Sequence, residues 1–331
     1  MKVVCVTGGT GFVGQHLVSC LVRDGEQVRV LTRHPEVVRR LWPKDSVEPW
    51  PGDLTMAETL RGFTDKASVV YHFGGEIQDA RYFEAVNVAG TRNLLKACCQ
   101  QKILRFVHLS SVGIIGADGA VAIDETSPCH PQNAYEKSKH NAELIVLDAF
   151  STMQLPVIII RPTIIFGEGL RRGHDSFAAW MKAIETGRFR FIGSNDAVAN
   201  YIYVKDVVEV CLRLADTVKA IGQVYIVSDS CSIRAFVGAA TGFLGVKMSG
   251  NIPTWLAYVL AIGFETVGRL TGFTSPLTLN RIKALRSQVK YSGDKVMQDL
   301  GFFPEVGWYE GLRRTIKWYK QNKLLLNETL E

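Results

Sequence analysis

The sequence lacks the cysteine pattern of a disulfide-rich or zinc-binding protein. Its 331 residues include seven cysteines, and no two of them form a C-x-x-C pair. An odd number of cysteines without such spacing, most of them in apolar stretches, is typical of reduced thiols in a protein core. We therefore expect no disulfide framework, no metal centre and a reducing, cytoplasmic environment.

The sequence also lacks a concentrated charge of one sign. The net charge is only +6, and the lysines and arginines are dispersed, without a long basic stripe. This distribution argues against a nucleic-acid partner, although it allows a weak attraction to anionic cofactors or membrane surfaces. The chain opens on the strand-like "KVVCVTGG", with no charged leader before an apolar stretch, so we expect no secretion signal.

What the sequence does contain is an alternation of apolar runs and helical segments, in a chain that is 47% hydrophobic and 21% charged. The apolar runs are continuous, as in strands buried on both faces of a sheet, and the alternation predicts βαβ units. We expect an α/β fold: a doubly wound parallel sheet of the Rossmann type, with a second, smaller, mostly helical substrate domain. We expect residues 1–166 and 197–230 to form the dinucleotide-binding domain, and residues 167–196 and 231–331 to form the substrate-binding domain. The predicted strands lie at 2–7, 27–32, 68–73, 105–110, 157–162 and near 225.

The segment "VTGGTGFVG" follows the first strand and opens a helix. Gly8, Gly11 and Gly14 permit a tight turn, a close approach to a pyrophosphate and close packing of the helix on the sheet. The second strand ends in Thr32 and Arg33, where an NAD site usually has an acidic residue for the ribose 2′-hydroxyl. An arginine there can pair with a 2′-phosphate, so we expect NADP, with NAD as the alternative.

Further polar and small residues follow other strands at the same predicted edge of the sheet. Asp53 in "PGDL" follows a third strand-like stretch, where its carboxylate can accept from the adenine amino group. Gly74 and Gly75 in "YHFGGE" let a cofactor lie close to the backbone. Ser110 and Ser111 end the strand "RFVHLS". Ligands of open α/β sheets bind beyond the carboxyl ends of the strands, so these positions are candidate site residues.

In "NAYEKSKHNAE", Tyr135 stands four residues before Lys139, a spacing that places both side chains on one face of a helix. Alone, the pair is equally consistent with two side chains on a solvated helix face. Together with Ser110 and Ser111, it forms a candidate catalytic triad.

In order along the chain, "TGGTGFVG", "GDL", "NVAGTRNLL", "SSVGIIG", "YEKSK", "RPTIIFG", "YIYVKDV" and "LGFFPEVGWYEGLRRTIKWY" resemble the extended short-chain dehydrogenase/reductase superfamily. The resemblance includes its NAD-dependent epimerase/dehydratase and 3β-hydroxysteroid dehydrogenase-like members. It implies that Tyr135 is a general acid/base, that Lys139 supports it and holds the nicotinamide ribose, and that Ser111 orients the substrate oxygen. Asn87 in "VNVAGT" resembles the helix asparagine of the family, with a less defined role. A homodimer is also implied.

The expected cofactor-binding residues follow from the motifs above. They are Gly8, Thr10, Gly11, Phe12, Val13, Gly14, Arg33, Asp53, Leu54, Phe73, Gly74, Gly75, Tyr135, Lys139, Pro162 and Thr163.

The substrate is expected to be a small, largely apolar molecule such as a 3β-hydroxysteroid-like alcohol or ketone. Ala199 stands where many nucleotide-sugar enzymes of this superfamily carry a phosphate-binding arginine. The segment 252–273 is nearly uncharged, and it would line an apolar pocket, lie on a membrane surface without crossing it, or be an ordinary domain helix. A nucleotide-sugar epimerase/dehydratase is the alternative, although Val112 and Gly113 replace the acidic pair of a dehydratase. A redox sensor that binds NADP without turnover is a third hypothesis, which the presence of the Tyr-Lys pair disfavours.

Overall fold

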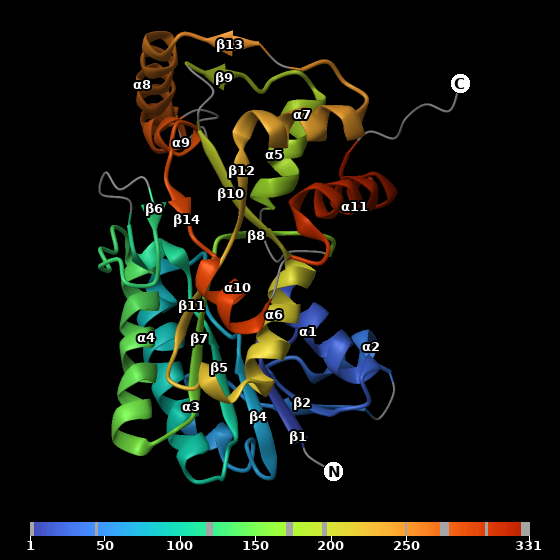
Figure 1. Cartoon of the computed structure of the whole chain (residues 1–331), viewed down its shortest axis with the longest axis vertical. Helices are drawn as coiled ribbons and strands as arrows, with labels where there is room; N and C mark the ends of the chain where they lie inside the picture. The colour runs from blue at the N-terminus through green and yellow to red at the C-terminus, as the bar shows by residue number, and fades with distance from the viewer. Residues whose placement is uncertain are drawn as a thin grey trace.

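The structure is a computed structural model of the whole chain (Figure 1). It describes residues 3–43, 46–116, 122–169, 175–193, 197–248, 250–271, 278–301 and 304–325. The predicted loop at 170–174 and the end of the predicted apolar helix at 272–273 lie outside these residues.

A seven-stranded sheet, in which every neighbouring pair is parallel, forms the lower half of the molecule in Figure 1. The order β11-β7-β5-β4-β1-β2-β3 confirms the predicted doubly wound sheet. Each predicted strand is present, and the strand-like stretch before Asp53 is β3. The strands are β1 (Val3–Thr7), β2 (Gln27–Thr32), β3 (Val47–Pro51), β4 (Ala67–His72), β5 (Arg105–Leu109), β7 (Val157–Pro162) and β11 (Val224–Val227).

Helices cover both faces of this sheet. On one face, α1 (Phe12–Arg23), α2 (Pro35–Leu41) and α6 (Val204–Asp216) share a buried apolar cluster with the strands. On the other face, α3 (Gly90–Cys99) and α4 (Ala134–Met153) contribute to a second cluster. A π-helical turn, Glu84–Ala89, leads into α3. This burial on both faces explains why the strands are continuous apolar runs.

The upper half in Figure 1 is built around a cluster of aromatic side chains. Phe236 lies at its centre, with its ring centroid 4.8 Å from that of Tyr201 and 5.5 Å from that of Trp180. The strands around it are short, and helices dominate, as predicted for this part of the chain. The remaining elements of the chain are β6 (Ala122–Ile123), β8 (Ile164–Phe166), α5 (Ser176–Glu185), β9 (Phe191–Ile192), β10 (Val198–Tyr203), β12 (Asp229–Ser232), α7 (Ile233–Leu244), β13 (Asn251–Ile252), α8 (Thr254–Thr271), α9 (Leu279–Leu285), β14 (Lys290–Tyr291), α10 (Asp294–Leu300) and α11 (Gly307–Gln321). Of these, α10 packs against α6 and β11, and its Val296 belongs to the apolar cluster of the main sheet.

The inclusion of 197–230 in the dinucleotide domain implies that this segment returns to the main sheet, and for β10 that expectation is wrong. Helix α6 packs on the sheet and β11 joins it, whereas β10 pairs with β8 and β12 in a separate three-stranded sheet. The cause is the alternation of side chains in β10. Tyr201 and Tyr203 pack against Phe166 in the aromatic cluster, instead of presenting a continuous apolar run to two helical layers. The proposed division into two domains stays a prediction.

Among the described residues, none of the helices combines the length and the hydropathy needed to cross a bilayer.

Candidate active site

The turn between β1 and α1 has the shape of a phosphate cradle. Gly8 has a φ of +69°, and a Cβ atom there would lie 2.6 Å from the backbone nitrogen of Gly74. A Cβ atom at Gly14 would lie 2.1 Å from the carbonyl oxygen of Gly8. No side chain caps α1 at Gly11, and the first turn of the helix carries no acidic residue. The start of α1 therefore offers a positive helix end without a competing carboxylate, which fits the pyrophosphate of a dinucleotide.

The other residues predicted to hold the cofactor lie around the same edge of the sheet. Thr10, Phe12 and Val13 belong to the turn and the start of α1, Leu54 follows β3, Phe73, Gly74 and Gly75 follow β4, and Pro162 and Thr163 end β7.

Arg33 and Asp53 meet at the ends of β2 and β3. The Nη1 atom of Arg33 lies 3.9 Å from Oδ2 of Asp53, and the arginine side chain is 62% exposed. Asp53 also accepts hydrogen bonds at Oδ1 from the backbone nitrogen of Thr55 at 2.8 Å and from its hydroxyl at 2.9 Å. An exposed pair at this distance is held weakly, so the guanidinium can turn toward a ligand anion.

Tyr135 owes its place to the start of α4. The Oδ1 atom of Asn133 accepts a hydrogen bond from the backbone nitrogen of Glu136 at 2.9 Å, and Oε2 of Glu136 accepts one from the nitrogen of Asn133 at 3.3 Å. This capping box fixes the first helical residue as Ala134. Tyr135 therefore lies in the first turn, above the carboxyl end of the sheet.

Ser111 is placed beside the same helix by strand β5. It lies two residues after Leu109, the last residue of the strand, and its Oγ atom accepts a hydrogen bond from the backbone nitrogen of Gly113 at 3.1 Å. The short helical turn that Ser111 begins, Val112–Ile114, contacts α4. The structure thus brings Ser111 and Tyr135 to one edge of the sheet, as the sequence predicts.

Lys139 lies one turn below Tyr135 and is buried. Its Nζ atom donates a hydrogen bond to the carbonyl oxygen of Leu109 at 2.6 Å. Burial, only partly offset by the carboxylate of Glu143, lowers the pKa of Lys139 to about 8. The ammonium group is therefore retained at neutral pH at a cost in desolvation.

The electrostatics of Tyr135 differ from our expectation. Its ring packs edge-on against Phe83, with the ring centroids 5.7 Å apart. Burial, and to a smaller extent the carboxylate of Glu136, raises the pKa of Tyr135 to about 12. The supporting role of Lys139 implies that its ammonium lowers the pKa of Tyr135. This lowering is absent because the ammonium is bound to the carbonyl oxygen of Leu109, and no hydrogen bond joins it to Tyr135 among the described residues.

Asn87 has a clear structural role. Its buried side chain accepts a hydrogen bond at Oδ1 from the backbone nitrogen of Glu76 at 2.7 Å and donates one from Nδ2 to the hydroxyl of Ser138 at 2.9 Å. Ser138 donates in turn to the carbonyl oxygen of Tyr135 at 2.7 Å. Asn87 thus ties the loop after β4 to the first turns of α4.

A buried ion pair beneath the site was missed at the level of the sequence. Glu143 on α4 and Arg161 on β7 approach to 2.5 Å, and their side chains are 2% and 6% exposed. Oε2 of Glu143 also accepts a hydrogen bond from the Ser110 hydroxyl at 2.6 Å. Two signals were available: a charged residue inside the apolar strand "VIIIRP", and a glutamate four residues after Lys139 on the same helix face.

His72 was also missed, although it directly precedes the loop "FGG". The hydroxyl of Thr91 donates to the carbonyl oxygen of Asn87 at 2.5 Å, so it accepts from Nε2 of His72 at 2.8 Å. The Nδ1 atom then accepts a hydrogen bond from the hydroxyl of Thr7 at 2.7 Å. The same hydroxyl accepts a hydrogen bond from the backbone nitrogen of Gly74 at 3.0 Å. Burial, with the nearby Lys139 ammonium, lowers the pKa of His72 to about 3. The neutral ring links the glycine turn to α3.

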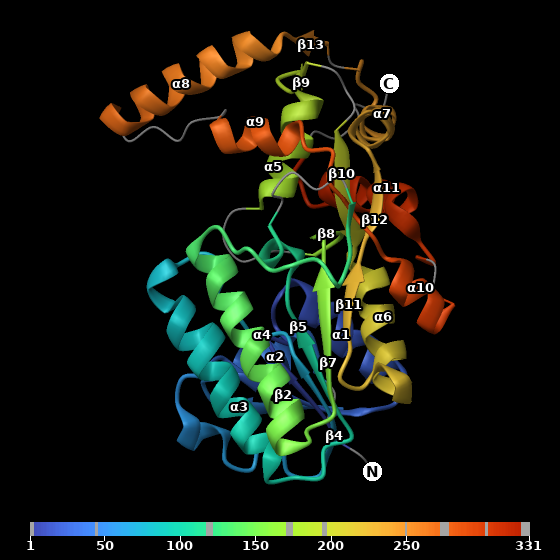
Figure 2. The same ribbon diagram turned by 60° about the vertical axis from the view of Figure 1, so that its left-hand side comes forward.

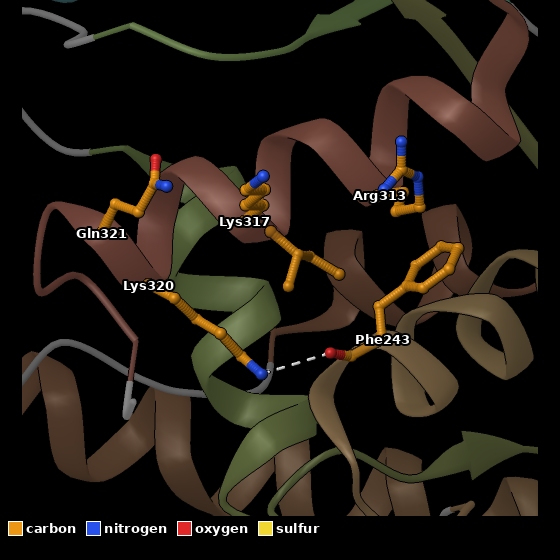
Figure 3. A pocket seen from close by; sticks show the side chains of 6 residues that line it. Phe243, Arg313, Lys317, Lys320 and Gln321 are labelled. Atoms are coloured by element: carbon orange, nitrogen blue, oxygen red, sulfur yellow. Dashed lines mark hydrogen bonds between the residues drawn. The ribbon is translucent and has the colours of Figure 1, made fainter. Parts of the chain in front are cut away.

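A hollow of about 450 Å³ opens elsewhere on the surface, between α7 and α11 (Figure 3). In Figure 3, Lys320 reaches across it from α11 and donates to the carbonyl oxygen of Phe243 at 3.3 Å. None of the residues predicted to bind cofactor or substrate lines this hollow. The chemistry argued above therefore belongs to the carboxyl edge of the main sheet.

A parallel sheet of this order and a glycine cradle at its first helix define a Rossmann-type dinucleotide-binding fold, and a Tyr-Lys pair lies at the start of α4. Residues 4–228 match the NAD dependent epimerase/dehydratase family, and the chain belongs to that family. It is accordingly an enzyme of the extended short-chain dehydrogenase/reductase type, as the sequence motifs predict.

Curated relatives act on different kinds of molecule. The chain is 28% identical to the 3beta-hydroxysteroid-dehydrogenase/decarboxylase isoform 1 of Arabidopsis thaliana, over 98% of this chain and 83% of the relative. It is 29% identical to a 4-hydroxy-2-methyl-3-oxo-4-farnesyl-3,4-dihydroquinoline-1-oxide ketoreductase of Stigmatella aurantiaca, over 93% of each. It is 25% identical to the dTDP-D-glucose 4,6-dehydratase of Homo sapiens, over 97% of this chain and 91% of the relative.

Proposed function

We propose that this protein is a nicotinamide-dependent oxidoreductase that interconverts a secondary alcohol and a ketone on a largely apolar molecule. The observation that carries the proposal is the convergence of Ser111, Tyr135 and Lys139 at the edge of the sheet where the glycine cradle opens. A bound nicotinamide supplies a ring that accepts or donates a hydride.

Cofactor binding is assigned to residues whose geometry fits a dinucleotide. The turn at Gly8, Gly11 and Gly14 holds the pyrophosphate, because close packing leaves no room for side chains at Gly8 and Gly14. The carboxylate of Asp53 accepts a hydrogen bond from the adenine amino group. Arg33, exposed and without an acidic neighbour on its strand end, pairs with a 2′-phosphate, so NADP is preferred over NAD.

Tyr135 moves the proton. Its pKa of about 12 keeps the phenol protonated at neutral pH, which suits donation to a carbonyl oxygen during reduction. Ser111 donates a hydrogen bond to the same oxygen and orients it. Lys139 is assigned to the cofactor ribose, as the family resemblance implies.

The apolar character of the substrate rests on two observations. Ala199 is buried in the aromatic cluster, so it offers no cation to a diphosphate at the position where many nucleotide-sugar enzymes of the family have an arginine. Ile164, which directly follows Thr163 at the end of β7, is 56% exposed and gives the same edge an apolar side chain. The hydroxysteroid and farnesyl-quinoline relatives act on molecules of this kind.

A nucleotide-sugar epimerase or dehydratase is the second candidate. It is favoured by the family and by the dTDP-D-glucose 4,6-dehydratase relatives. The residues after Ser111 are Val112 and Gly113, so the acidic pair of a dehydratase is missing there.

A substrate screen separates the two candidates. Purified protein is given NADPH or NADH with a hydroxysteroid or farnesylated ketone, and cofactor fluorescence is followed. UDP- and dTDP-sugars are titrated in parallel by calorimetry. Turnover of an apolar ketone supports the oxidoreductase, whereas tight sugar-nucleotide binding without any response to apolar ketones would favour the epimerase. Sedimentation of the same samples tests the homodimer that family resemblance implies.

A further inference from the structure

Helix α8 carries an unusually apolar exposed side. Trp255, Val259 and Ile262 recur at i, i+4 and i+7 and are 67%, 59% and 56% exposed. Leu260 and Phe264 are also partly exposed, at 39% and 37%, but they lie on other sides of the helix. We call Trp255, Val259 and Ile262 the apolar face of α8. From Thr254 to Thr266, the only charged residue of the helix is Glu265.

The opposite side of α8 is packed and polar groups are satisfied there. Ala257 and Ala261 are fully buried in a small cluster with Ile282 of α9. Oε1 of Glu265 accepts a hydrogen bond from the backbone nitrogen of Leu279 at 2.9 Å. The helix is therefore held by α9 through its inner side, and the apolar face points away from that contact.

The apolar face lies at one end of the molecule. Figures 1 and 2 both place α8, β13 and β9 at the end farthest from the main sheet, and Figure 2 shows α8 reaching outward beyond α9. β13 leads directly into α8 and pairs with β9. An apolar surface at such an end can meet a flat partner without obstruction by the Rossmann sheet.

The segments at this end carry more basic than acidic residues. Between Gly245 and Ser287, the chain has five lysines and arginines and a single acidic residue, Glu265, which accepts a hydrogen bond from the start of α9. On the β9 side, the segment 186–193 adds two arginines and no acidic residue. The exposed cations of these two segments that the structure describes are Arg188, Arg190, Lys247, Lys283 and Arg286.

We propose that the apolar face of α8 docks on a bilayer surface rich in anionic headgroups, with the helix lying in the membrane plane. An uncharged apolar helix face surrounded by cations is the arrangement that such surfaces bind, because apolar burial and attraction to anionic lipid act together. The helix does not span the bilayer. The docking goes beyond the proposed oxidoreductase activity and does not depend on it, but it would bring the site to a substrate dissolved in lipid.

The test uses the full-length protein and two kinds of vesicle, phosphatidylcholine alone and phosphatidylcholine mixed with phosphatidylglycerol, in a flotation assay without substrate. We expect binding to the mixed vesicles that weakens as salt is added, since salt screens the attraction of the cations. The Val259→Glu variant should lose about tenfold or more in affinity. The matched control is Val218→Glu, the same change at a side chain that is 72% exposed in the short helical turn Val218–Ala220 between α6 and β11.

Far-UV circular dichroism establishes that both variants are folded, and Ile262→Ser provides a milder change if Val259→Glu is not. Equal vesicle binding by wild type, Val259→Glu and Val218→Glu would overturn the proposal, as would no binding to either vesicle. Sedimentation velocity tests whether the apolar face instead binds a second copy of this chain. If the wild type forms an oligomer, Val259→Glu is monomeric and neither protein binds vesicles, the face is an interface between copies of this chain.

Discussion

We expect that Lys139 lowers the free energy of unfolding of the protein. Its ammonium is buried, and its pKa falls from 10.5 to about 8 mainly through desolvation, a fall that corresponds to roughly 3 kcal/mol of lost stability while the group is charged. Replacing Lys139 by Met removes that penalty but leaves the carbonyl oxygen of Leu109 without its donor, a loss of about 1–2 kcal/mol. We expect Lys139→Met to be inactive yet about 1–2 kcal/mol more stable near pH 7.

The stability of the wild type should depend on pH through the proton on Lys139. Below pH 8, both the folded and the unfolded wild type carry the proton on Lys139, so the full penalty is present. Between pH 8 and 10.5, the folded state gives up this proton while the unfolded state keeps it, so wild-type stability rises with pH. The advantage of Lys139→Met should therefore shrink between about pH 7 and about pH 10.

Urea unfolding of the ligand-free protein, followed by tryptophan fluorescence, measures the difference at both pH values. Lys137→Met is the matched control, because Lys137 lies on the same helix but is exposed, and it should be nearly neutral. The reasoning is refuted if Lys139→Met is less stable than the wild type near neutral pH by an amount that does not change with pH.

The remaining predictions concern cofactor choice, the buried ion pair and substrate binding. Arg33→Ala should weaken NADPH binding by about 1.5–3 kcal/mol and NADH binding much less, and titrations that show equal weakening contradict the 2′-phosphate role. Arg161→Met should destabilise the fold by about 3–5 kcal/mol in urea unfolding, because it leaves Glu143 buried without its partner; a loss below about 1 kcal/mol speaks against this. Ile164→Asp should raise KM for an apolar ketone, whereas Val218→Asp should not, and equal KM values would remove Ile164 from the substrate site.

The main sheet was predictable because its strands obey simple local rules. The segments "VVCVT", "QVRVLT" and "VIIIRP" are continuous apolar runs between helical segments, and only a parallel sheet covered on both faces buries such runs. The glycine turn and the Tyr-Lys pair were also predictable from the sequence, because each depends on the spacing of residues that are close together in the chain. β10 was not among the predicted strands, because its pairing with β8 and β12 depends on the tertiary packing of its tyrosines against Phe166.

The electrostatics of the site were not predictable in the same way. The pKa of Tyr135 depends on how deeply the phenol is buried, and the hydrogen bond of Lys139 depends on where the end of β5 lies. The Glu143–Arg161 pair joins residues 18 positions apart, which no local pattern connects. These features arise from the distances between elements, and a sequence read segment by segment does not contain those distances.

Turnover by the Tyr135→Phe variant tests the proposed acid–base role most directly. The wild type and the variant are compared with NADPH and the ketone that the wild type reduces fastest in the screen, and cofactor binding is measured separately by fluorescence titration. We expect turnover to fall by about 10²–10⁴-fold while the affinity for NADPH is retained, because only the proton donor is lost and the ring still packs against Phe83. Turnover close to that of the wild type, with intact cofactor binding, would show that Tyr135 is not the group that moves the proton.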